Sequence, residues 1–125
     1  MAVENLGKTI TIPAAGDLSA KQYRFMSLNS AGRCDVSGDG VNAEGVSQDD
    51  PSAIDQPTCV MVGHGITKVE AGASFSVNAN LGSDSVGRAI STVTGDYIMG
   101  KAMEASTGAG QIIKMLFKPR GSVAP

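Results

Sequence analysis

The chain has 125 residues, of which 42% are hydrophobic, 4% are aromatic and 16 are glycine, which is typical of one small domain with a lean core and many turns. Its formal net charge is −2 and no basic stripe is present, so the sequence offers no electrostatic basis for nucleic-acid binding. No apolar run approaches the length of a membrane span, and residues 1–6 do not resemble a secretory signal, so we expect no membrane contact and synthesis in a cytoplasm.

In chain order, short β-prone segments alternate with turn clusters rich in Gly, Ser, Asn and Asp. The predicted strands are 8–12, 22–28, 32–36, 43–47, 57–72 with a bend at 63–65, 74–80, 87–93, 96–105 and 111–117. This spacing predicts a mainly β fold, a small single-domain β-barrel or β-sandwich, with at most one short helix.

Two local features carry further expectations. The turn "SGDG" favours a hairpin between 32–36 and 43–47, and "DDPSAI" at 49–54 favours one helical turn, with Asp50 as the cap and Pro51 in the first helical position. Residues 1–12 are interpreted as an extended N-terminal arm, 13–118 as the β domain and 119–125 as a non-globular C-terminal tail.

The stretch "CDVSGDGVNAEG" begins like a calcium loop, with Asp35, Ser37 and Asp39 followed by Gly40. Such a loop needs a bidentate Glu at its twelfth position, and counting from Asp35 that position is Val46. No helical pattern flanks the stretch. We therefore expect a metal-free turn.

No constellation in the sequence indicates catalysis or a cofactor. Cys34 and Cys59 are the only cysteines and are interpreted first as small buried hydrophobes, with a disulfide as the alternative. His64, the single histidine, lies between Gly63 and Gly65 without a sequence-apparent partner. We expect no enzyme activity, no metal and no cofactor.

A lean core suggests that stability is shared with other subunits. Tyr97, Met99 and Met103 lie on one face of the predicted strand 96–105 and are candidates for a core or subunit contact.

Three successive stretches, "NAEGVSQDD", "VMVGHGITKVEAGASFSVNANLGSDSVGRAIST" and "GDYIMGKAMEASTGAGQIIKMLF", resemble tailed-phage capsid decoration proteins, also called cement proteins. The resemblance covers roughly residues 30–117. The family's closing pattern of glycines, small residues and strand is matched by Gly95, Gly100, Ala102, Glu104, Ala105, Gly110, Ile112 and Leu116, and its preceding basic residue by Arg88. Lys114 and the insert "SAIDQPT" depart from the pattern.

The resemblance implies a non-enzymatic virion protein that binds the outer surface of an icosahedral head, often as a trimer, and clamps neighbouring major capsid proteins. It would be made in the host cytoplasm. The expected capsid-contacting arm residues are Met1, Ala2, Val3, Glu4, Asn5, Leu6, Lys8 and Ile10, since "KTITI" is β-prone and such an edge pairs readily with another sheet. Another virion part, such as a tail or fibre module, and a small β-rich carbohydrate-binding domain or enzyme remain as alternatives.

Overall fold

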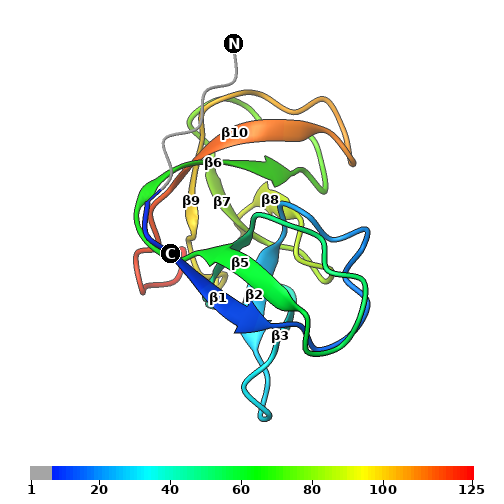
Figure 1. Cartoon of the computed structure of the whole chain (residues 1–125). Helices are drawn as coiled ribbons and strands as arrows, with labels where there is room; N and C mark the ends of the chain where they lie inside the picture. Colours follow the sequence, from blue (N-terminus) through cyan, green and yellow to red (C-terminus); the bar gives the residue numbers. More distant parts are fainter. Residues whose placement is uncertain (1–6) are drawn as a thin grey trace.

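The computed structural model describes residues 7–125, and every regular element in this range is a β-strand (Figure 1). Ten strands form two antiparallel sheets of five strands each, neither of which closes into a barrel. The first sheet contains β1 (Thr9–Pro13), β2 (Phe25–Leu28), β3 (Cys34–Val36), β4 (Gly45–Ser47) and β5 (Pro57–Met61). The second contains β6 (Gly65–Glu70), β7 (Asn80–Ser83), β8 (Ala89–Ser91), β9 (Gly100–Ala102) and β10 (Ile112–Phe117). The predicted mainly β fold is confirmed, in its sandwich-like form.

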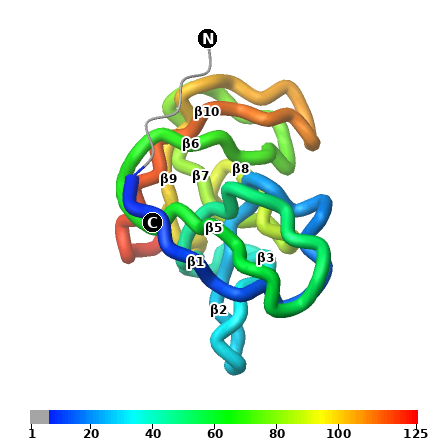
Figure 2. The backbone as a smooth tube through the Cα atoms, in the orientation of Figure 1, coloured from blue at the N-terminus to red at the C-terminus, as the bar shows by residue number. Residues whose placement is uncertain are grey.

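The two sheets have the same topology. Their strand orders are β1-β5-β4-β2-β3 and β6-β10-β9-β7-β8, so each strand of the second sheet occupies the place of the strand five earlier. The registers agree as well, because Val46 faces Met61 in the first sheet as Lys101 faces Leu116 in the second. The chain therefore consists of two halves built on one five-stranded motif, joined by a short link at residues 62–64 (Figure 2).

The core follows this repeat. One buried cluster lies within the first half and consists of Ile12, Ala14, Leu18, Met26, Cys34 and Val60. The topologically equivalent residues of the second half are Val69, Ala71, Phe75, Leu81, Ala89 and Met115. These belong to a larger cluster that also contains Phe25, Val46 and Met61 of the first half. The larger cluster thus joins the two halves, and burial at this junction favours their packing.

Strand ends follow from local chemistry. β10 alternates inward Ile113, Met115 and Phe117 with less buried Ile112, Lys114 and Leu116, as a half-buried strand requires. β1 ends at Pro13, which cannot donate to a ladder and is tolerated because β1 lies at the edge of its sheet.

The predicted strand 74–80 is not formed, since Phe75 makes only an isolated bridge and β7 begins at Asn80. The predicted hairpin and the predicted helical turn were also wrong. β3 does not pair with β4, because β2 lies between them and pairs with both. The hairpin turn is instead 29–33, where the Asn29 carboxamide oxygen accepts hydrogen bonds from the backbone N–H groups of Ala31 and Arg33. Segment 49–54 contains no helical turn. The Asp49 carboxylate does not cap a helix and instead accepts a hydrogen bond from the Cys59 N–H.

Both ends of the described chain belong to the domain. Thr9–Pro13, which overlaps the predicted arm, pairs with β5 along its whole length. Val123 in the predicted tail forms a bridge with Tyr97, and the Ala124 N–H donates to the Asp96 carbonyl at 2.8 Å. The tail is therefore held by its own chain.

Candidate interaction surfaces

Within residues 7–125, β1 lies at the unpaired edge of its sheet. The Lys8 carbonyl accepts the Val62 N–H at 2.8 Å, and the Ala14 N–H donates to the Gln56 backbone carbonyl at 2.9 Å. The backbone groups of the even-numbered residues along β1 therefore face β5. Because hydrogen-bonding positions alternate along an antiparallel pair, the backbone groups of Thr9 and Thr11 face away from β5. Ile10 is 40% exposed on the same strand. The edge therefore offers main-chain donors and acceptors beside an apolar side chain.

Glycine packing fixes the start of this edge. A Cβ on Gly7 would collide with the carbonyl oxygens of Gly63 and His64, and the Gly63 N–H donates to the Lys8 carbonyl at 3.0 Å. Two backbones thus lie in contact where the chain enters β1, next to the link between the halves. Of the predicted arm residues, Lys8 and Ile10 are exposed here, whereas Met1, Ala2, Val3, Glu4, Asn5 and Leu6 lie outside the described residues.

The three candidate subunit-contact residues do not form one exposed face. Met99 is fully buried in the core of the single chain. Tyr97 is half-buried against that core, and Met103 is 37% exposed. Their predicted alignment assumed one long strand, but only Gly100–Ala102 is a strand.

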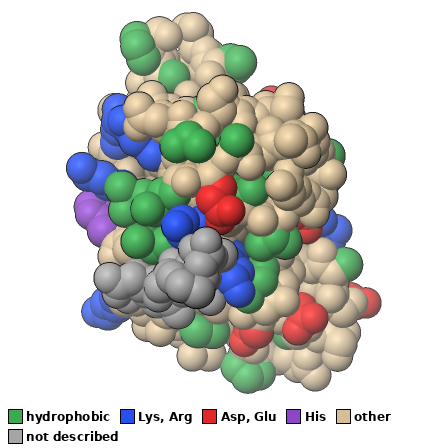
Figure 3. Space-filling view, turned by 90° about the horizontal axis from the view of Figure 1, so that it is seen from above, with side chains coloured by type: hydrophobic (Ala, Val, Ile, Leu, Met, Phe, Trp, Pro, Cys, Tyr) green, Lys and Arg blue, Asp and Glu red, His purple; other side chains and the backbone are tan. Residues whose placement is uncertain are grey.

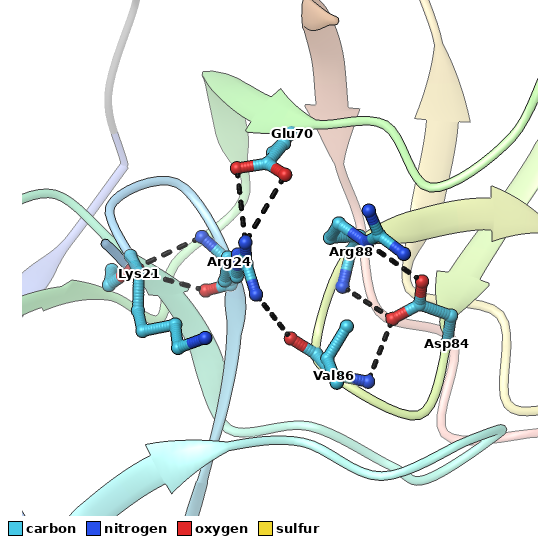
Figure 4. A network of polar contacts seen from close by, with 7 residues as sticks. Lys21, Arg24, Glu70, Asp84, Val86 and Arg88 are labelled. Carbon is cyan, nitrogen blue, oxygen red and sulfur yellow. Dashed lines mark hydrogen bonds and ion pairs between the residues drawn. The ribbon is translucent and has the colours of Figure 1, made fainter. Parts of the chain in front are cut away.

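A buried ion pair joins the halves and was missed from the sequence. Arg24, 9% exposed, donates from Nη2 to the Glu70 carboxylate at 3.2 Å and from Nη1 to the Val86 carbonyl at 3.2 Å (Figure 4). Nearby, the Asp84 carboxylate accepts from Arg88 Nε at 3.2 Å. Arg24 thereby fixes the turn 84–88 of the second half against β2 of the first. The 46-residue separation of Arg24 and Glu70 left no local pattern to reveal this contact.

Three cationic side chains line one surface hollow of about 280 Å³. Lys101, Lys118 and Arg120 surround it, together with Gly100 and Leu116, and none of these lining residues is acidic. In the face seen in Figure 3, Lys and Arg lie mainly towards the left and Asp and Glu mainly towards the right. Such a hollow suits carboxylate groups of a partner.

The calcium-like loop is used for local hydrogen bonds. The Asp35 carboxylate accepts the Val36 N–H at 2.8 Å, buried Ser37 lies 2.7 Å from the Ser27 hydroxyl, and Gly40 takes a positive φ of 68°. Within residues 7–125, no group of three or more His, Cys, Asp or Glu side chains is placed to hold a metal ion.

The thiols are unbonded and differ in environment. Both Cys34 and Cys59 are free, Cys34 being buried and Cys59 half-buried. Burial raises the pKa of the Cys34 thiol, because the thiolate would lose its hydration. His64 is exposed. In the part of the chain that the structure describes, no helix has the length and apolar character needed to cross a membrane.

Comparisons with known proteins point to one architecture. No protein-family model matches the sequence, and no curated protein does. Among solved structures, the chain is similar to the N base of the head fibre protein gp8.5 of bacteriophage phi29, with a TM-score of 0.73 and 20% sequence identity. The similarity covers 89% of this chain and 93% of that one. The two chains therefore share a fold over nearly their whole length.

Proposed function

We propose that the chain is a structural protein of a phage virion that binds the outer surface of the icosahedral head and clamps neighbouring major capsid proteins. The fold similarity to a phage head fibre base carries this proposal. The independent sequence resemblance to capsid decoration proteins supports it. We assign it no catalytic step and no cofactor.

The β1 edge supplies a physical mode of attachment. A strand of the capsid protein added at Thr9 and Thr11 would gain main-chain hydrogen bonds worth about 0.5–1.5 kcal/mol each. The basic hollow at Lys101, Lys118 and Arg120 would receive carboxylates on the same partner. Such contacts are individually weak, and a trimer repeating them three times would bind by avidity.

A second candidate is the base of a head fibre. The similar solved structure is itself the base of a phage head fibre protein, and this favours the second candidate. Both candidates place the chain on the head, and they differ in what the chain carries. A fibre base holds further protein that projects outward, whereas a clamp lies flat across neighbouring capsid proteins.

The test uses purified virions of the phage that encodes the chain. Mass spectrometry should find the chain in the particles in many copies, and cryo-electron microscopy should place its two-sheet density on the outer head surface between capsid subunits. Density that continues outward as a shaft would favour the fibre base. Absence of the chain from virions, or its location in the tail, would overturn the head-binding proposal. His64→Ala should bind heads as the unsubstituted chain does.

A further inference from the structure

From Arg24 onward, the two halves are equivalent residue by residue, not only strand by strand. A constant offset relates Asn29 to Asp84, Gly45 to Gly100 and Gln56 to Gln111. Each polar pair makes the same contact: the Asp84 carboxylate accepts the Val86 and Arg88 N–H groups as Asn29 does in its own turn. Gln111 accepts the Thr107 N–H as Gln56 accepts that of Ser52. For any contact that residues of one half make, the equivalent residues of the other half can therefore be identified.

Turn 84–88 is docked on the first half. The Phe25 N–H donates to the Gly87 carbonyl at 2.7 Å, and Arg24 binds the Val86 carbonyl (Figure 4). The approach is close, since a Cβ on Gly87 would lie 2.7 Å from the Phe25 carbonyl oxygen and 3.2 Å from Val36 Cβ. Arg24, Phe25 and Val36 thus form a docking site for this turn.

Turn 29–33 has the same shape but no docking site within the described chain. Gly32 has a φ of 76°, against 81° for Gly87, and the two turns share the sequence pattern Asn/Asp-Ser-x-Gly-Arg. A Cβ on Gly32 would meet nothing within 4 Å, and residues 29–32 are exposed. Figure 1 shows the β2–β3 hairpin projecting from the body of the molecule.

The second half has a surface at the equivalent position, with different side chains. Its residues equivalent to Arg24, Phe25 and Val36 are Ala79, Asn80 and Ser91. Phe25 is fully buried, whereas Ala79 and Asn80 are half-buried and Ser91 is exposed.

The contact between the halves is consequently head-to-tail. A two-fold relation would dock turn 29–33 on the second half of the same chain, and that turn is exposed instead. A head-to-tail contact leaves one free turn at one end and, at the other, an equivalent site beside which the chain's own C-terminal tail lies. Repeating the contact builds rings when the rotation closes.

We propose that turn 29–33 of one copy docks on Ala79, Asn80 and Ser91 of a second copy, repeating between chains the contact that turn 84–88 makes within one. The C-terminal tail lies beside this site: the Gly95 N–H donates to the Ala124 carbonyl at 3.0 Å, where its equivalent Gly40 donates to Ser83 at 2.9 Å. Leu28 is the equivalent of Ser83. In the docked pair, the Leu28 carbonyl of the incoming copy would therefore replace the Ala124 carbonyl as the acceptor of the Gly95 N–H. Self-association of this kind does not require the virion role and is tested on the purified full chain.

The decisive variant is Gly32→Asn. Asn tolerates positive φ and finds open space in the single chain, so the fold should persist. In the docked pair, its Cβ would meet the Asn80 backbone as a Cβ on Gly87 would meet that of Phe25. Gly110→Asn is the matched control, because Gly110 also has positive φ and open space, and its equivalent, Asp55, already carries a side chain at a φ of 67°.

Sedimentation velocity over a concentration series should show association of the unsubstituted chain and of Gly110→Asn, with more than about tenfold weakening in Gly32→Asn. Ser91→Lys should weaken it equally from the opposite side. Mixing the two weakened variants should restore two-chain complexes, because the intact turn of one meets the intact site of the other. An unsubstituted chain that stays monomeric, a Gly32→Asn variant that associates normally, or a mixture that gives no complexes would each overturn the proposal.

Discussion

Gly87→Ala tests how tightly the two halves are docked, and Gly32→Ala is its internal control. Both glycines have positive φ in equivalent turns, so alanine at either costs about 1–2 kcal/mol in backbone strain. Only at Gly87 would the new methyl group meet a carbonyl oxygen at 2.7 Å. Relieving that overlap adds about 1–3 kcal/mol for overpacking and about 0.5–1.5 kcal/mol for weakening the Phe25–Gly87 hydrogen bond.

We therefore expect Gly87→Ala to lower the free energy of unfolding by about 2.5–6.5 kcal/mol and Gly32→Ala by about 1–2 kcal/mol. Urea unfolding, followed by circular dichroism at a concentration where all three proteins are monomeric, measures the difference. With a denaturant slope of about 2 kcal/mol per molar urea, the two midpoints should differ by about 1–2 M. Equal losses in the two variants would refute close docking of turn 84–88.

Three further predictions concern the arm, the ion pair and the thiols. Deleting residues 1–6 should leave the circular dichroism spectrum nearly unchanged and weaken attachment to heads, and equally tight decoration by the truncated chain would leave the β1 edge and the basic hollow as the whole anchor. Arg24→Met should lower stability by roughly 3 kcal/mol, because it leaves the half-buried Glu70 carboxylate without its partner; a double-mutant cycle with Glu70→Gln that gives no coupling would contradict this. In native protein at neutral pH, Ellman's reagent should modify Cys59 well before Cys34, because burial both shields Cys34 and raises its pKa, and equal rates would mean that the core opens readily.

The basic hollow depends on residues far apart in the chain. Lys101 lies in β9, whereas Lys118 and Arg120 follow β10, and only the pairing of β9 with β10 brings them around one hollow. The amino-acid sequence does contain one direct signal of the repeat. "NSAGR" at 29–33 and "DSVGR" at 84–88 share their turn residues, and the structure shows that these two stretches occupy equivalent places in the two halves.

The sequence by itself determined the β class. Alternation in Ile112–Phe117 sets which side chains point inward, and an Asx side chain with a positive-φ glycine shapes both hairpin turns, because these preferences act through steric and hydrogen-bonding effects within a few residues. Only the tertiary structure decided that β2 lies between β3 and β4, and that Arg24 meets Glu70. Two turns of nearly the same sequence also end in opposite environments, one docked and one exposed. Their local geometry is the same, and the difference arises from how the two halves pack, which no residue of either turn encodes alone.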